Sequence, residues 1–309
     1  MFPTGSDTTR PLMLHAMPKA GFVAIVGKPN AGKSTLLNRI IGEKLAIVSE
    51  KPQSTRDRIV GIHTTDDMQM ILLDTPGLLN PRYELQRAMR STALRTMKDA
   101  DVILYLADAT ERMPPTLIVA AELEASPSAP VVLVLNKADA LRPVERTELA
   151  EQLPDAWFIS ALTGEGVDDL LRALAQQLPE SPFLYPEDEI STASMRFFVA
   201  ELVRETALEQ LSDEVPYSLA CEVEEFREGQ TPLYIRAVLY VERESQKRIL
   251  IGAGGQRIRD IGRTARGKIE TFVGGPVYLD LWVKVLPNWR KSESAVRRFG
   301  YRLHDDSSA

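Results

Sequence analysis

The sequence predicts two domains of different class, an α/β domain on a mostly parallel sheet followed by a smaller α+β domain. Length is the first observation, because 309 residues exceed the roughly 100–200 residues of a single domain. The second is a regular alternation of β-branched runs and helical patterns in the first half of the chain. The third is the loss of that alternation beyond residue 193, where strands follow one another beside helices.

Apolar runs predict the strands of the first domain. The runs that begin at Gly21, Asp101 and Pro130 are apolar almost throughout, which is typical of strands buried on both faces. The run RIVGIHT alternates instead, which predicts a half-exposed edge strand. From Gly21 to about Leu178 we therefore expect a doubly wound sheet with helices on both faces. Its strands are expected at GFVAIVG, RIVGIHT, MQMILLD, DVILYLAD, PVVLVLNK and AWFIS.

A linker separates the two domains. The segment from Leu178 to Glu189, LPESPFLYPEDE, carries three prolines and four acids and shows no periodicity. Beyond it we expect a helix at 194–211, strands at 217–227 and 233–242, a short helix to 251, the turn GAGG, a longer helix and a strand at 277–285. The predicted boundaries are a disordered tail at 1–18, the first domain at 19–180, the linker at 181–192 and the second domain at 193–303.

Composition restricts the class of protein. Hydrophobic residues make up 44% of the chain, so it can build ordinary cores, and collagen, coiled-coil and mucin-like classes are excluded. The net charge of −6 would repel nucleic acid or an acidic membrane unless a local patch is basic. One cysteine, no apolar run long enough to cross a membrane and no signal-peptide core in residues 1–18 favour the cytoplasm. We expect a monomer.

A phosphate-binding loop follows the first strand. Residues 27–34, GKPNAGKS, match the spacing G-x-x-x-x-G-K-[ST], and a helical pattern comes directly after them. Backbone N–H groups of such a loop surround a phosphate, and Lys33 adds a full charge for the β- and γ-phosphates. The Ser34 hydroxyl is placed to ligate Mg²⁺. The predicted nucleotide ligands here are Gly27, Asn30, Ala31, Gly32, Lys33, Ser34 and Thr35.

The base is predicted from the ends of two later strands. Asn136, Lys137 and Asp139 lie at the carboxyl end of the fifth strand, where open α/β sheets bind ligands. The Asp139 carboxylate can accept from both the N1–H and the amine of guanine, whereas adenine offers no N1–H. We therefore predict GTP or GDP over ATP, with a buried carboxylate as the discriminating group. Backbone N–H groups at Ser160 and Ala161 are expected to meet the guanine carbonyl.

Two further motifs complete the expected nucleotide site. Asp74, in the sequence DTPG, closes the third strand and is placed to hold Mg²⁺ through water, while the Gly77 N–H can meet the γ-phosphate. Thr55, in QSTR, can complete the Mg²⁺ shell when GTP is bound. The predicted metal ligands are Ser34, Thr55 and Asp74, and the predicted catalytic residues are Lys33, Thr55, Gly77 and Asn30.

Together these motifs resemble the translation-factor-related GTPases, and more closely the Era family. The resemblance rests on GKPNAGKST, QSTRDRIVG, DTPGL, NKAD and SAL and covers nearly everything from Gly21 to Tyr301. It implies a P-loop NTPase G domain followed by a type II KH domain. It also implies GTP hydrolysis coupled to ribosomal RNA processing and to assembly of the small ribosomal subunit.

Residue 78 sets this chain apart from Ras-like enzymes. In Ras-like enzymes, as the resemblance implies, the D-x-x-G motif is followed by a glutamine that orients the attacking water. Here Leu78 occupies that position, and its side chain has no polar atom. Asn30 resembles the asparagine that helps cation-activated GTPases coordinate K⁺, although an asparagine that only caps the loop is the alternative. We therefore predict slow hydrolysis that K⁺ accelerates.

A basic segment in the second domain predicts RNA binding. Residues 243–268 hold eight basic side chains against two acidic ones, opposite in sign to the whole chain. At its centre the G-x-x-G turn would let a nucleic-acid backbone approach closely, as in a KH fold. Ile258, Ile261, Ala265 and Ile269 share one face of the following helix. The predicted RNA-binding residues are Gly252, Ala253, Gly254, Gly255, Arg257, Arg259, Arg263 and Arg266.

The sequence leaves some readings open. A non-hydrolysing RNA-binding protein that holds guanine nucleotide as a structural ligand is one alternative. A GTPase that lies on the inner face of the cell membrane is another, because a basic patch attracts lipid headgroups as well as RNA phosphate. Trp289 and Arg290 lie near the end of the last strand and are further candidates for RNA contact. Trp282 is expected to be packed or half-exposed.

Overall fold

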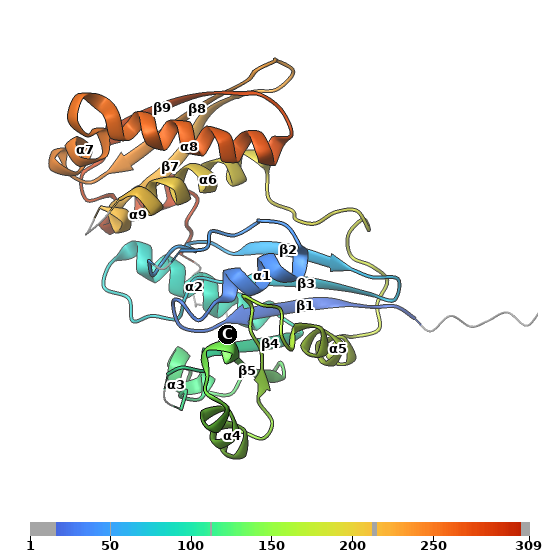
Figure 1. Ribbon diagram of the computed structural model, residues 1–309. Coiled ribbons are helices and arrows are strands. Elements are labelled where there is room, and N and C mark those ends of the chain that lie inside the picture. Colours follow the sequence, from blue (N-terminus) through green and yellow to red (C-terminus); the bar gives the residue numbers. More distant parts are fainter. Residues whose placement is uncertain (1–16, 50, 112, 212–214, 304–309) are drawn as a thin grey trace, which may run out of the picture.

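The computed structural model of this protein describes residues 17–49, 51–111, 113–211 and 215–303. The predicted tail at 1–18 therefore lies almost wholly outside the described residues. The described chain forms two domains, drawn one above the other in Figure 1. The lower domain carries a six-stranded sheet and the upper a three-stranded sheet.

The first sheet has the strand order β2-β3-β1-β4-β5-β6, and all neighbouring strands are parallel except β2 and β3. This confirms the mostly parallel sheet and places RIVGIHT at its edge, as its alternation predicted. The expected run AWFIS contributes a strand of only two residues. The strands are β1 (Lys19–Val26), β2 (Ile59–Thr64), β3 (Met68–Asp74), β4 (Val102–Asp108), β5 (Val131–Asn136) and β6 (Trp157–Phe158).

Helices cover both faces of this sheet, as predicted. On one face Leu37 of α1 and Leu170 of α5 belong to the same buried cluster as Ile25 of β1. On the other face Met97 of α2 and Leu117 of α3 pack with buried residues of β1 and β4. The helices are α1 (Lys33–Ile41), α2 (Glu84–Asp99), α3 (Leu117–Ala121), α4 (Pro143–Gln152) and α5 (Val167–Gln177), with a 3₁₀ turn η1 (Ala138–Ala140) after β5.

The linker is attached to the edge of the first sheet. The Ile62 N–H of β2 donates to the Ile190 carbonyl at 2.9 Å. The amide of the buried Gln69 accepts from the Leu184 and Tyr185 N–H groups at 2.7 and 2.9 Å and donates to the Tyr185 carbonyl. The linker thus covers part of the exposed edge of β2, which would otherwise present unpaired backbone groups.

The second domain has the element order expected of a type II KH fold. Strand β8 pairs antiparallel with β7 and parallel with β9, and α6 and α8 pack on one face of this sheet around a shared core. On α8 the predicted buried face is confirmed at Ile261, Ala265 and Ile269, which are fully buried, whereas Ile258 is only half-buried. The elements are α6 (Met195–Gln210), η2 (Pro216–Ser218), β7 (Ala220–Arg227), β8 (Leu233–Val241), α7 (Glu244–Ile251), η3 (Ala253–Gly255), α8 (Gln256–Val273) and β9 (Val277–Val285).

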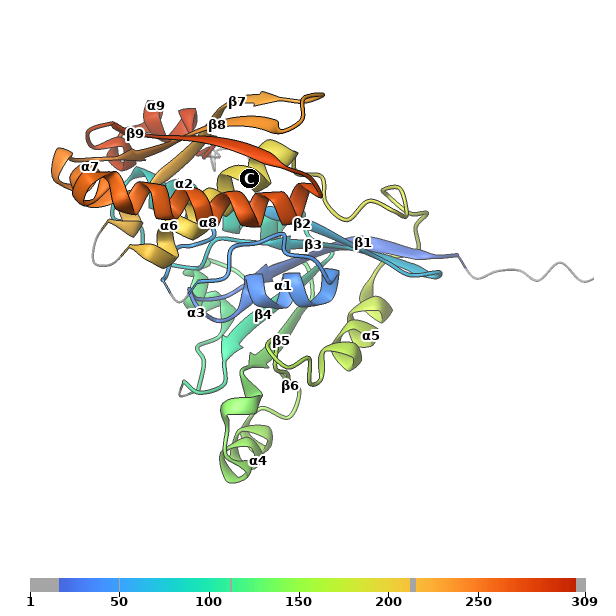
Figure 2. The same ribbon diagram turned by 45° about the horizontal axis from the view of Figure 1, so that its top comes forward.

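A C-terminal segment that the sequence patterns did not predict joins the two domains. It contains η4 (Trp289–Lys291) and α9 (Glu293–Arg298). Trp289 and Val296 pack in one buried cluster with Met89 of α2 and Tyr240 of β8. Helix α6 forms a second junction: Figure 1 shows it between α8 and the first domain, and in Figure 2 it passes behind α8. The domains therefore meet through buried side chains on two sides.

Candidate functional site

The phosphate-binding loop has the conformation that its sequence predicts. Gly32 has a φ of +95°, and a Cβ there would lie 2.2 Å from Nδ2 of Asn136, so only glycine fits. Lys33 begins α1 and is buried, and its Nζ donates to the carbonyls of Gly27 and Lys28 at 3.2 and 3.0 Å. Burial lowers the pKa of Lys33, and the Asp74 carboxylate partly offsets that. The ammonium therefore already points into the loop that would hold phosphate.

Three predicted metal ligands converge beside this lysine. The Ser34 Oγ donates to Oδ2 of Asp74 at 2.7 Å and lies 2.8 Å from the Thr55 Oγ1. Asp74 is fully buried, yet its Oδ1 has no hydrogen-bond partner among the described residues. Burial raises the pKa of Asp74 to about 6, against the opposing effect of Lys33. A divalent cation would satisfy the free oxygen and the buried charge together, so the donor set fits Mg²⁺.

A cavity of about 300 Å³ opens above these groups. Gly77 borders it and approaches the phosphate loop closely, because a Cβ there would lie 2.6 Å from the Pro29 nitrogen. Leu78 is buried, and its N–H donates to the Gly27 carbonyl at 2.9 Å. The predicted residues among the cavity walls are Asn30, Gly32, Lys33, Ser34, Thr35, Thr55, Gly77 and Lys137. Sequence reasoning missed Ile47, Val48 and Ser49, which belong to no motif, and Gln53 of the QSTR motif also lines the cavity.

Asn136 holds two nucleotide loops together. Its Nδ2 donates to the Ala31 carbonyl at 2.8 Å, and its Oδ1 accepts from the Ala161 N–H at 2.8 Å. The Ser160 N–H donates to the Glu165 carbonyl. Both N–H groups therefore have partners inside the protein in the nucleotide-free structure. Their predicted contact with a guanine carbonyl stays a prediction, and it requires that one of these hydrogen bonds be shared or displaced.

Asp139 lies in η1, beyond β5, and is exposed. Without a nucleotide this carboxylate is open to solvent, so its predicted role in selecting guanine depends on burial by a bound base. Lys137, in a left-handed conformation, pairs its Nζ with the Asp108 carboxylate. Lys137 borders the cavity, whereas Asp139 is not among the residues that line it.

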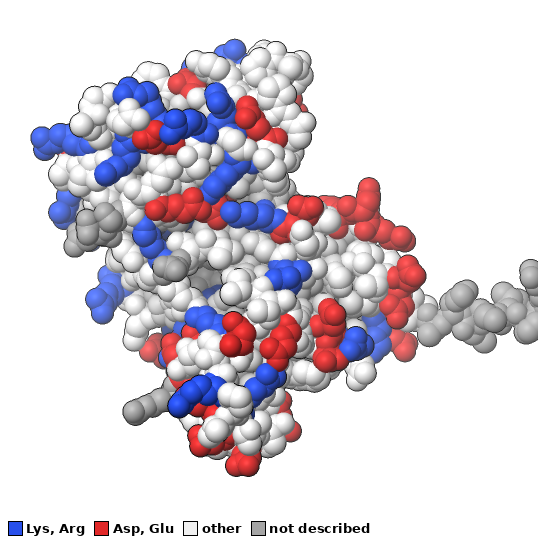
Figure 3. Space-filling model, viewed as in Figure 1, with Lys and Arg blue, Asp and Glu red and all other residues white. Residues whose placement is uncertain are grey.

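The second domain presents the predicted glycine turn and its basic helix on one surface. Residues 252–255 connect α7 and α8, and Ala253 and Gly254 are exposed. Gly252 has a φ of +74°, and a Cβ there would lie 2.8 Å from that of Arg257. Arg257, Arg259, Arg263 and Arg266 are all exposed. Figure 3 shows Lys and Arg side chains gathered over this part of the upper domain.

A groove of about 440 Å³ runs between α8 and β9. Arg259, Arg263 and Arg266 border one side, and strand β9 supplies the other, which sequence reasoning missed. The alternation of VYLDLWVKV was the signal, because it places Leu279 and Leu281 on the same face of β9. The remaining lining residues are Ile258, Gly262, Tyr278, Leu279 and Leu281.

Three residues of the second domain do not behave as the sequence predicted. Trp289 is fully buried and donates its Nε1–H to the Ser218 carbonyl, so it cannot stack on RNA. Arg290 pairs with Glu242 and lies over the Tyr83 ring at the domain junction. Lys268, counted in the basic segment, turns inward to Glu205 and Glu209. Trp282 is 54% exposed, as expected.

The comparisons with known proteins match both halves of the chain. A family model described as "50S ribosome-binding GTPase" matches residues 22–137, and a KH domain model matches residues 214–290. The GTPase Era of Carboxydothermus hydrogenoformans is 43% identical over 291 residues, which cover 92% of this chain and 98% of that protein. The chain belongs to the GTPase Era family. The Era of Ectopseudomonas mendocina is also 43% identical, over 293 residues that cover 92% of this chain and 97% of that protein.

Solved structures of Era agree with this assignment. An Aquifex aeolicus Era variant bound to GDP·AlF₄⁻ matches with a TM-score of 0.86 and 41% identity, over 92% of this chain and all of that one. An Era in complex with MgGDPNP and nucleotides 1506–1542 of 16S ribosomal RNA matches with the same score and identity, over 93% of this chain and all of that one. The predicted family, the G domain and the C-terminal KH domain are thereby confirmed.

Proposed function

We propose that this chain binds and hydrolyses GTP with Mg²⁺, and that the nucleotide controls how its KH domain holds small-subunit ribosomal RNA. One observation carries the proposal: the buried Asp74 carboxylate, with an oxygen that lacks a partner in the described part of the chain, lies beside the Ser34 and Thr55 hydroxyls at the mouth of a cavity that Lys33 lines. Such a group of oxygens and one ammonium is suited to a metal-bound triphosphate.

Each residue in or beside the cavity would have a separate role in binding the nucleotide and its metal. Lys33 would exchange its two carbonyl partners for the β- and γ-phosphates, and the Gly77 N–H would meet the γ-phosphate. Ser34, Thr55 and Asp74 would hold Mg²⁺, which neutralises charge on the transferred phosphoryl group. Asp139 would read guanine.

A group other than the side chain of residue 78 must orient the attacking water. Leu78 is buried and has no polar side-chain atom, so it cannot orient that water. Asn30 lines the cavity, which supports its proposed role in holding K⁺ there. The alternative, an asparagine that only shapes the loop, predicts no response to K⁺.

The groove between α8 and β9 supports the RNA half of the proposal. Its size, its bordering arginines and the exposed glycine turn suit a single strand whose phosphates face the basic side. A relative of 41% identity was solved with 16S ribosomal RNA. We extend that partner to this chain, and with it a role in ribosomal RNA processing and in assembly of the small ribosomal subunit.

The proposed domain boundaries remain 19–180 for the G domain, 181–192 for the linker and 193–303 for the KH domain. The proposed location is the cytoplasm. None of the helices in the described ranges is long and apolar enough to span a bilayer. Peripheral contact of the basic helix α8 with an anionic membrane is the competing proposal. Competition between anionic liposomes and RNA for the full chain separates the two.

Binding and turnover on the full-length chain test the function. Calorimetry with GTP, GDP and ATP should show binding of the guanine nucleotides alone. A 16S RNA fragment corresponding to nucleotides 1506–1542 should then bind more tightly with a non-hydrolysable GTP analogue than with GDP. ATP held as firmly as GTP would refute the guanine site. Single-turnover hydrolysis near zero, even with RNA and K⁺, would favour the non-hydrolysing alternative, which the family assignment does not support.

A further inference from the structure

The loop that carries Thr55 is held in place by the KH domain. This loop, residues 42–58, connects α1 to β2 and forms part of the nucleotide cavity. The Ser54 carbonyl, directly before Thr55, accepts from Nη2 of Arg204 on α6 at 2.5 Å. Arg56, directly after Thr55, donates to the Leu219 carbonyl at 2.6 Å. Both neighbours of this metal-ligand candidate are therefore anchored in the other domain.

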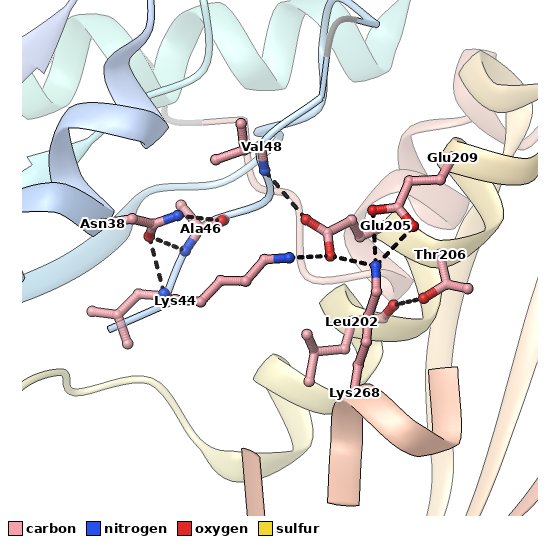
Figure 4. A network of polar contacts seen from close by, with 10 residues as sticks. Asn38, Lys44, Ala46, Val48, Leu202, Glu205, Thr206, Glu209 and Lys268 are labelled. Atoms are coloured by element: carbon pink, nitrogen blue, oxygen red, sulfur yellow. Dashed lines mark hydrogen bonds and ion pairs between the residues drawn. The ribbon is translucent and has the colours of Figure 1, made fainter. Parts of the chain in front are cut away.

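The other end of the loop is bound to the same helix. The carboxylate of Glu205 pairs with Lys44 at 2.7 Å and accepts from the Val48 N–H at 3.4 Å (Figure 4). Val48 is one of the cavity walls. Glu205 also pairs with Lys268 of α8 at 3.0 Å, so the contact continues to the helix that borders the RNA groove.

Burial of these charges argues for a specific geometric role. Arg204 and Glu205 are each 1% exposed, and Arg56 is 4% exposed. Nη1 of Arg204 and Nε of Arg56 have no hydrogen-bond partner among the described residues. Buried ion pairs contribute little net stability, and unpaired donors cost free energy. If α6 served only to pack against the first domain, apolar side chains at positions 204 and 205 would be more favourable.

We propose that Arg204 of the KH domain is a positioning residue of the nucleotide site. By fixing the Ser54 carbonyl, it holds the Thr55 hydroxyl toward Ser34 and Asp74, and Glu205 fixes the Val48 wall in the same way. Helix α6 thus favours binding of the triphosphate, whose metal uses Thr55, over binding of the diphosphate. The inference rests on the proposed role of Thr55.

The test uses the full-length chain and measures its affinity for GDP and for a non-hydrolysable GTP analogue, both with Mg²⁺. Arg204→Lys keeps the charge but loses the planar fork that bridges Glu201 and Ser54. It should weaken binding of the GTP analogue about tenfold and leave GDP affinity unchanged. Thr55→Ala should show the same selective loss, and the double variant should be no weaker than Thr55→Ala alone, because both changes act through one hydroxyl.

Matched variants keep the outcome decisive. Arg298→Lys also changes a KH-domain arginine, but one whose side chain bonds to Glu222 and Tyr240 of the same domain, so both affinities should stay as in the parent. Glu205→Gln is nearly isosteric and loosens the opposite end of the loop, and it should weaken the GTP analogue about threefold with GDP unchanged. This variant serves if Arg204→Lys does not fold.

Each result has one meaning. Equal losses for GDP and the GTP analogue in the Arg204 and Glu205 variants would reduce α6 to a structural support and overturn the inference. Losses that multiply in the double variant would overturn it too, because Arg204 would then act independently of Thr55. If Thr55→Ala itself leaves the analogue's affinity intact, the proposed metal role of Thr55 fails, and the inference fails with it.

Discussion

Replacing Asn136 by alanine removes a support that joins the phosphate loop to the loop after β6. In the parent chain this amide satisfies the Ala31 carbonyl and the Ala161 N–H, both at 2.8 Å, and is itself buried. Alanine leaves two buried backbone groups without a partner, at a cost of about 1–3 kcal/mol each. The free energy of unfolding should therefore fall by about 2–6 kcal/mol even without nucleotide. The lower bound corresponds to roughly 4–8 °C in Tm for a domain of this size.

Thermal unfolding of the nucleotide-free chain, followed by circular dichroism, measures this effect. Asp139→Ala is the matched control, because Asp139 belongs to the same motif but is exposed. It should leave the Tm of the free chain unchanged and abolish the preference for GTP over ATP in calorimetry. If Asn136→Ala melts within about 1 °C of the parent, the amide is not a structural support and the reasoning from its two hydrogen bonds is refuted.

Three further predictions concern the metal, the monovalent cation and the RNA. Burial raises the pKa of Asp74 from 3.8 to about 6, so the free energy of unfolding of the metal-free chain falls as pH rises from 3.8 to about 6. Mg²⁺ binding needs the ionised carboxylate and therefore weakens as pH falls below about 6. Mg²⁺ titrations of GTP binding should give an affinity about tenfold weaker at pH 5 than at pH 7.5, and a flat profile would contradict the assignment. Turnover should rise at least about tenfold in K⁺ over a non-coordinating cation, and Asn30→Ala should abolish that rise; equal turnover in both salts would eliminate the K⁺ role. Arg259→Gln should reduce the magnitude of the slope of log affinity for single-stranded RNA against log salt concentration by about 0.7. The control is Arg172→Gln, which changes an exposed arginine of α5 and should leave the slope as in the parent. The same slope in the parent and in both variants would exclude a phosphate contact at Arg259.

Local patterns determined most of the first domain and the family. Apolar runs predicted its strands, and the alternation of RIVGIHT predicted the edge strand. A strand buried on both faces is apolar throughout, whereas a strand buried on one face alternates apolar and polar residues. The motifs from Gly27 to Ala161 were sufficient to predict a guanine-nucleotide site, since all of them except QSTR follow a parallel strand and parallel strands end at the same edge of a sheet.

The roles of single residues depended on contacts that no local pattern encodes. Asn136 proved to be a support and Asp139 an exposed side chain, although both belong to one four-residue motif. Trp289 is buried and Lys268 turns inward, because the surface around each is covered by elements distant in the sequence. Periodicity reports that a residue is buried or exposed, but not which element covers it.

By itself the amino-acid sequence determined the order of the elements along the chain up to β9, the nucleotide motifs and the basic helix of the KH domain. Only the tertiary structure decided that α6 lies against the 42–58 loop and that Arg204, 150 residues away, bonds to Ser54. The physical reason is range. Hydrophobic periodicity and turn chemistry act over a few residues, whereas the docking of two domains depends on complementary surfaces that form only after each has folded.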